Sequence, residues 1–302
     1  MLDALVRGLK RRDRRSLARL ISIAARGESI AELVAQLGAP PKSARVIALT
    51  GAGGVGKSTL TGKLIEMLRA KEQSVAVLAC DPQSPITGGA LLGDRFRMPM
   101  RPDDAGVYIR SLAAPSGRQA VAQHLDTITL VCEHFGFDYI LVETVGAGQG
   151  DTAVRDVADA VVLLLQPETG DDLQWEKAGV LEVVDMIVVH KADLPGAERT
   201  IHQLQMMLEM AGQTSLPVFP VSSRSGAGLD DLVAALERVR PRERVRSAAQ
   251  RRLWEAVQAE LLQRWKRLET DGAIAALCTQ PQWQAAVSEA VEKLCSSTKR
   301  KN

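Results

Sequence analysis

The residues from Gly51 to Ser58 have the types and spacing of a phosphate-binding loop. Their sequence, GAGGVGKS, matches the P-loop pattern G-x-x-x-x-G-K-[ST]. Glycines let successive backbone N–H groups turn toward a polyanion, Lys57 adds a full positive charge, and the Ser58 hydroxyl is placed to ligate Mg²⁺. A glycine-rich turn can match by chance, but here a predicted strand precedes the loop and a predicted helix follows it. The predicted nucleotide contacts are Gly51, Gly53, Gly54, Val55, Gly56, Lys57, Ser58 and Thr59.

Acidic residues at two other predicted strand ends could complete this site. Asp81 ends one apolar run and opens a long loop that also carries Asp94, while Glu143 ends another run and is followed by Gly146. Such carboxylates can hold Mg²⁺ or its waters, and the Gly146 N–H can reach a terminal phosphate. Each carboxylate could instead be an ordinary solvated loop residue, but a neighbouring P-loop favours the metal role. We predict Lys57, Asp81, Asp94, Glu143 and Gly146 as the catalytic group, and Ser58, Asp81, Asp94 and Glu143 as the metal environment.

The stretch His190-Lys191-Ala192-Asp193 resembles the guanine-reading signature N-K-x-D. A carboxylate at Asp193 can accept from N1–H and the exocyclic N2–H₂ of guanine, which adenine does not offer, and the Lys191 stem can lie along the ring. His190 replaces the usual Asn; it can still donate to guanine N7, but it cannot reproduce every loop contact of an amide. It could also be a neutral structural substitution. A second base-contacting loop is predicted at Ser222, Ser223 and Arg224.

The elements that must position these residues alternate between strand and helix from residue 44 onward. The predicted strands are 45–50, 74–79, 107–110, 139–143, 160–165, 186–189 and 218–221, and the P-loop helix is 59–68. The run 74–79 is apolar and β-branched and has no polar alternation, as in a strand covered on both faces. We predict an α/β fold with a doubly wound, mostly parallel sheet, in which ligands bind beyond the carboxyl ends of the strands.

Helical sequences flank this α/β region on both sides. Helical periodicity over residues 1–38 is ended by Gly27 and followed by a short second helix, 29–37. After Arg240 two apolar stripes follow, and we expect them to form partly an oligomer interface. Their members are Trp254, Val257, Leu261, Trp265, Leu268, Trp283, Val287, Ala290 and Leu294. The predicted domains are 1–42, 43–240 and 241–302.

Composition narrows the class of protein. The 302 residues carry a formal charge of only +2, and basic clusters at 10–15 and 240–252 are best read as solvated helix faces, which argues against a nucleic-acid partner. The four cysteines and four histidines form no ligand cluster or disulfide framework. No apolar run reaches the length of a membrane span. We expect a cytoplasmic protein.

Longer stretches resemble one family, the MeaB/ArgK-type GTPases of the SIMIBI class, which are chaperones of adenosylcobalamin-dependent acyl-CoA mutases. The resemblance is carried by DPQSPITGGALLGDR from Asp81, by FDYILVETVGAGQ from Phe137, and by GDDLQ from Gly170 with Lys177. It extends over nearly the whole chain. Two relatives fit less well: MinD-like ATPases have a lysine where Ala52 stands, and nickel-insertion GTPases usually carry metal-binding Cys or His motifs.

The resemblance implies roles for several residues. Ser58, Asp81, Asp94 and Glu143 would surround Mg²⁺, and Lys57 would contact phosphate. The segment 168–177 would be a switch that signals nucleotide state to the mutase, through Glu168, Asp171, Asp172, Gln174 and Lys177. The helical tail would make a homodimer.

We therefore expect a Mg²⁺-dependent GTPase with slow intrinsic turnover that binds GTP and GDP and regulates cofactor loading or rescue of such a mutase. Two alternatives stay open from the residues alone. One is a small-molecule kinase, although no acceptor pocket is apparent. The other is a nucleic-acid-associated GTPase that uses the basic run 240–252.

Overall fold

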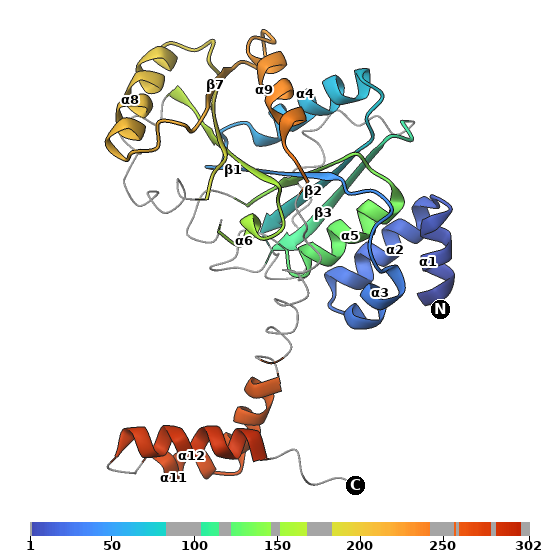
Figure 1. Ribbon diagram of the computed structural model, residues 1–302, viewed down its shortest axis with the longest axis vertical. Helices are drawn as coiled ribbons and strands as arrows, with labels where there is room; N and C mark the ends of the chain where they lie inside the picture. The colour runs from blue at the N-terminus through green and yellow to red at the C-terminus, as the bar shows by residue number, and fades with distance from the viewer. Residues whose placement is uncertain are drawn as a thin grey trace. The chain divides into compact units, whose positions relative to one another are not determined.

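Apolar, β-branched runs form the strands of one seven-stranded sheet in the computed structural model of this protein (Figure 1). The structure describes residues 2–82, 104–114, 122–145, 152–167, 183–241, 257, 260–278 and 282–296. It divides into two compact units, Met1–Arg242 and Glu243–Asn302. The sheet belongs to the first unit.

All strand pairs in this sheet are parallel, in the order β3-β2-β4-β1-β5-β6-β7. The prediction of a doubly wound α/β fold is therefore confirmed, and each predicted strand is present. The strands are β1 (Arg45–Gly51), β2 (Val75–Pro82), β3 (Val107–Ala114), β4 (Tyr139–Glu143), β5 (Ala160–Leu165), β6 (Met186–His190) and β7 (Val218–Val221). Because parallel strands end at one edge, the motifs at their carboxyl ends are brought to the same side of the sheet.

Helices cover both faces of the sheet, and alternate strand residues face two separate cores. Ile47 and Leu49 of β1 pack toward α4 (Lys57–Ala70) and α9 (Leu229–Arg238). Val46 and Ala48 pack toward the other side, which is covered by α5 (Leu125–Phe135), α6 (Thr152–Arg155) and α8 (Ala197–Met210) together with the N-terminal helices.

Helix α4 is anchored by a row of leucines on its buried face. Leu60, Leu64 and Leu68 recur at a spacing of four and are fully buried. Each such side chain contributes about 1.5–3 kcal/mol when it is removed from water. Lys57 and Ser58, in the first turn, are therefore presented at the sheet edge by a well-anchored helix.

The N-terminal region forms three helices instead of the two that the sequence predicted: α1 (Leu2–Lys10), α2 (Arg14–Ala25) and α3 (Ile30–Leu37). The break is caused by Asp13, whose carboxylate accepts from the N–H groups of Arg15 and Ser16 and caps α2. Arg12 before it has a positive φ of 61°. The apolar periodicity continues across this break, which is why the turn was not apparent in the sequence.

The second unit is helical. It contains residues 260–270, α11 (Ala273–Cys278) and α12 (Trp283–Ser296), and Arg264 Nη1 donates to the carbonyl of Leu294, 2.7 Å away. Trp265 and Trp283 remain 37% and 72% exposed. No helix in the described ranges is both long enough and apolar enough to cross a membrane.

Candidate nucleotide site

The P-loop joins β1 to α4 at the sheet edge. Its backbone needs glycine at two places: a Cβ on Gly51 would lie 2.5 Å from the carbonyl oxygen of Leu164, and Gly56 caps α4 with a φ of 100°. Lys57 Nζ donates to the carbonyls of Gly51 and Ala52 at 2.8 and 3.1 Å. The ammonium group therefore lies against the loop that would surround phosphate.

Ser58 contacts Glu143, one of the two described carboxylates that were predicted to hold metal; the other, Asp81, lies near the end of the neighbouring strand β2. The Ser58 hydroxyl donates to Glu143 Oε2 at 2.9 Å, and both Glu143 and Asp81 are only 2% exposed. In the sheet, Glu143 is paired with Leu49 of β1 and with Ala79 of β2. Asp81 therefore lies two residues further along β2 than the residue opposite Glu143. The pKa of the adjacent Cys80 thiol is raised to about 12, mainly because the thiol is buried and also because the charges of Asp81 and Glu143 lie nearby.

This donor set fits Mg²⁺, which prefers hard oxygen ligands such as carboxylates and hydroxyls. Within the described segments no three Asp, Glu, His or Cys side chains gather into a metal cage. Mg²⁺ commonly binds through one or two carboxylates together with substrate phosphates and water, so a cage is not required. Ser58, Asp81 and Glu143 are the described residues that would hold it.

His190 connects the P-loop to the loop after β7. It is 2% exposed, with Nδ1 2.8 Å from the Val55 carbonyl oxygen and Nε2 2.7 Å from Ser223 Oγ. Since a carbonyl only accepts, Nδ1 carries the proton and Nε2 of the neutral ring accepts from Ser223. Burial lowers the pKa of His190 below its usual value.

The imidazole of His190 makes contacts between loops that the sequence did not indicate. The single N–H of the neutral ring is used by Val55, and the predicted contact of His190 with guanine N7 stays a prediction. Gly56 permits the contacts between loops because a Cβ there would lie 2.4 Å from Nδ1.

The other residues of this predicted base-binding motif also converge. The Ser222 hydroxyl donates to Asp193 Oδ1 at 2.6 Å, and this bond is the main reason that the pKa of Asp193 is lowered. Because its pKa is lowered, Asp193 is ionised at neutral pH. Asp193 is also exposed, so its carboxylate can accept hydrogen bonds from a base. Arg224 and Thr59 are also exposed. Lys191 Nζ donates to the Gly54 carbonyl at 3.2 Å.

Three residues of the site were missed from the sequence. Gln166, just after β5, accepts from Lys191 Nζ through Oε1 at 2.7 Å. The Thr144 hydroxyl donates to the Thr50 hydroxyl at 3.0 Å, and both residues are buried. Polar residues at the ends of apolar strand runs were the available signal. The first contact joins the ends of β5 and β6, and the second joins the P-loop strand β1 to the end of β4.

Several predicted residues lie outside the described parts of the chain. They are Asp94, Gly146, Glu168, Asp171, Asp172, Gln174 and Lys177. Their predicted roles in metal binding, phosphate binding and signalling stay predictions.

Replacing His190 by Asn is expected to tighten GDP binding about two- to tenfold. An amide has two N–H donors, so one can contact Val55 while the other contacts guanine N7, and a net hydrogen bond contributes about 0.5–1.5 kcal/mol. Calorimetric titration of GDP into the wild type and His190→Asn measures this. Equal affinities would instead make His190 a neutral structural substitution.

The same pair of proteins should differ in the pH dependence of stability. Because the folded-state pKa of His190 is lowered, the unfolded chain binds more protons below the ordinary pKa of 6.5. Its contribution to stability is complete above that pH and is lost as the pH falls toward the folded-state pKa. Melting temperatures at pH 7.5 and 5.5 should therefore differ less in His190→Asn than in the wild type.

Comparison with known proteins adds to this geometry. The family model described as methylmalonyl Co-A mutase-associated GTPase MeaB matches residues 17–275. A Pyrococcus abyssi protein named as a GTPase is 42% identical over 211 residues, which are 70% of this chain and 65% of that protein. The fused isobutyryl-CoA mutase of Cupriavidus metallidurans is 39% identical over 202 residues, which are 65% of this chain but 18% of that protein.

Among solved structures, that of a LAO/AO transport system kinase is similar in fold. It has a TM-score of 0.70 and 21% sequence identity, and the match covers 98% of both chains.

Proposed function

The chain belongs to the MeaB family of methylmalonyl-CoA mutase-associated GTPases, and we propose that it is a Mg²⁺-dependent GTPase that acts as a chaperone of an adenosylcobalamin-dependent acyl-CoA mutase. In this proposal, binding and hydrolysis of GTP control cofactor loading or reactivation of the mutase. The useful output is the change in loop conformation that accompanies hydrolysis.

The observation that supports nucleotide binding best is the convergence of separate loops on one sheet edge. Ser58 of the P-loop helix contacts Glu143, and the P-loop residue Val55 contacts His190. His190 in turn contacts Ser223, while Asp193 is held by Ser222. Phosphate, metal and base functions would thus be joined by direct hydrogen bonds, which suits a nucleotide that spans all three.

Hydrolysis in such a site depends on positioning and on electrostatic stabilisation. Lys57 and the P-loop N–H groups would bind the phosphates, and Gly146 would help to place the attacking water. Mg²⁺, when bound, would neutralise charge that develops on the phosphate oxygens. We assign no general base.

A mutase partner is supported by two of the similarities. The matching family is described by its association with methylmalonyl-CoA mutase. The Cupriavidus metallidurans relative is named as a fused isobutyryl-CoA mutase, and 18% of its length aligns with this chain. We propose that this chain serves a mutase of the same acyl-CoA class.

The experiment compares intrinsic and mutase-stimulated hydrolysis in Lys177→Ala. The family resemblance assigns Lys177 to a signalling segment that needs no contact with nucleotide, so intrinsic GTP hydrolysis should stay near the wild-type rate. Stimulation by the mutase should fall at least about fivefold, the lower range for coupling between sites. Lys10→Ala, a change at an exposed lysine on α1, is the control and should alter neither rate.

An equal fall in both rates would place Lys177 in the basic active site and would contradict a signalling role. If no candidate mutase changes the rate for the wild type, the chaperone function is wrong. Stoichiometric release of phosphate without an acceptor separates this GTPase from a kinase.

We also propose a cytoplasmic homodimer. The four cysteines are free thiols, which favours a reducing compartment. The helical unit exposes Leu262, Trp265, Trp283, Val287 and Val291, and a soluble monomer generally avoids a large exposed apolar face. A light-scattering mass equal to one chain at micromolar concentration would contradict the dimer.

A further inference from the structure

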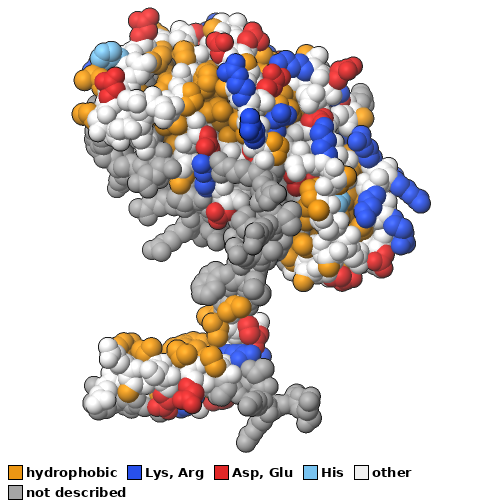
Figure 2. Space-filling view, in the orientation of Figure 1, with side chains coloured by type: hydrophobic (Ala, Val, Ile, Leu, Met, Phe, Trp, Pro, Cys, Tyr) orange, Lys and Arg blue, Asp and Glu red, His pale blue; other side chains and the backbone are white. Residues whose placement is uncertain are grey.

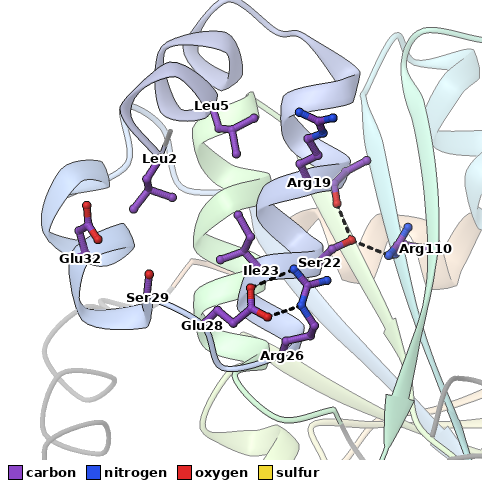
Figure 3. Close-up of a pocket in the computed structure, with 11 residues that line it drawn as sticks. Leu2, Leu5, Arg19, Ser22, Ile23, Arg26, Glu28, Ser29, Glu32 and Arg110 are labelled. Carbon is purple, nitrogen blue, oxygen red and sulfur yellow. Dashed lines mark hydrogen bonds and ion pairs between the residues drawn. The ribbon is translucent and has the colours of Figure 1, made fainter.

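A cavity of about 680 Å³ lies among the N-terminal helices, apart from the nucleotide loops (Figure 3). Its walls come from α1, α2, the turn between α2 and α3, the start of α3, and strand β3. None of the residues that line it belongs to the predicted nucleotide or metal site. The volume lies in the range of about 300–1,000 Å³ that is usual for small-molecule pockets.

One part of the wall is apolar. Leu2, Leu5 and Ile23 project between the surrounding helices in Figure 3. Leu5 is part of the core, and Leu2 and Ile23 are partly buried against it. This surface is therefore held in place by the core, and it could contact a hydrocarbon chain or ring.

Arginines gather on the side of the cavity nearest β3. Arg110 reaches in from β3 and donates through Nη2 to Ser22 Oγ at 2.8 Å. Its Nε is buried and has no hydrogen-bond partner in the described part of the chain. Arg19 is exposed and makes no hydrogen bond or ion pair with any described residue.

The acidic residues of the cavity do not cancel these two charges. Glu28 is engaged with Arg26 through two bonds of 2.6 and 3.0 Å, and that pair neutralises itself. Glu32 accepts from Gln36 and lies on the opposite side of the cavity in Figure 3. Lys and Arg side chains also gather at the surface over the N-terminal helices (Figure 2), which makes this region favourable for an anion.

We propose that this cavity binds a small amphipathic anion, with its carboxylate or phosphate head toward Arg19 and Arg110 and its apolar body against Leu2, Leu5 and Ile23. Guanidinium groups present several N–H donors in a planar fork that suits both kinds of head group. The Glu32 side disfavours a second anionic group at the other end of the ligand, so the ligand carries its anionic group at one end only.

The test titrates octanoate, octyl phosphate, octanol and octylamine into the full chain without nucleotide, by calorimetry. Both anions should bind more tightly than octanol, and octylamine should bind most weakly. Hydrogen–deuterium exchange should slow in α1, α2 and β3 when the anion is present. The relative affinities of octanoate and octyl phosphate separate a carboxylate site from a phosphate site.

Variants then test the two arginines. Arg19→Ala should weaken octanoate binding about tenfold, the effect expected for a charged hydrogen bond, and should leave octanol binding unchanged. Arg110→Met should have a similar effect and tests the same charge from a different element. Arg15→Ala, at an exposed arginine on α2 outside the cavity, should change nothing.

GDP binding should be the same in all of these variants and shows that they are folded. Three results would overturn the proposal: absence of anion binding at millimolar concentration, equal binding of octanoate and octylamine, or unchanged octanoate affinity in both Arg19→Ala and Arg110→Met. The first two are independent of whether the protein hydrolyses GTP.

Discussion

Replacing Lys57 by alanine is expected to lower GTP hydrolysis by about 10³-fold, because a fixed positive charge facing the phosphates is removed from a preorganised site. In the structure the Lys57 ammonium is held by the carbonyls of Gly51 and Ala52, at the P-loop itself. It therefore has little distance to move when phosphates replace these acceptors.

The loss should be seen in kcat more than in KM, since charge on the transferred phosphate is stabilised most strongly in the transition state. Lys63→Ala is a matched control on the same helix: its ammonium pairs with Glu66 at 3.0 Å, and its loss should leave hydrolysis unchanged. Single-turnover phosphate release measures both variants. Hydrolysis at the wild-type rate in Lys57→Ala would show that the nucleotide site lies elsewhere.

The sheet could be predicted from the sequence because most of its strands are continuous apolar runs. Ala160–Leu165 and Met186–His190 are buried at every position, so no polar alternation obscures them. The placement of Gly51, Asp81, Glu143 and His190 at one edge then followed from parallel topology alone. This part of the site depends on local sequence and on one rule of architecture.

Contacts between distant residues could not be predicted in the same way. His190 and Val55 are separated by 135 positions, and their hydrogen bond depends on how the P-loop lies against β6. The sequence pattern suggested a ligand contact for His190, and it did not indicate the contact with the protein that the structure shows. The turn before Asp13 was missed for a different reason. The apolar spacing continues through this turn and indicated one helix, but Asp13 caps the start of α2 and divides the segment into two helices.

Glu143→Gln is expected to reduce hydrolysis at millimolar Mg²⁺ by about 10²-fold, in the range found when a single stabilising group is removed from such a site. The substitution keeps the shape of the side chain and an oxygen that can still accept from Ser58. It removes the negative charge, however, and a neutral amide is a weaker ligand for Mg²⁺ or for its bound waters. The fold should therefore be retained while the metal is bound less tightly.

A titration of hydrolysis against Mg²⁺ concentration separates this metal effect from a general disturbance. The curve for Glu143→Gln should shift to higher Mg²⁺, and part of the rate should return at saturation. Glu133→Gln is the matched control: Glu133 is also buried, but it accepts from the Ala44 N–H at 3.1 Å on the face of the sheet covered by α5. It should leave the Mg²⁺ dependence unchanged. If Glu143→Gln lowered the rate equally at all Mg²⁺ concentrations, Glu143 would act by positioning Ser58 and the P-loop, and its assignment to the metal would be wrong.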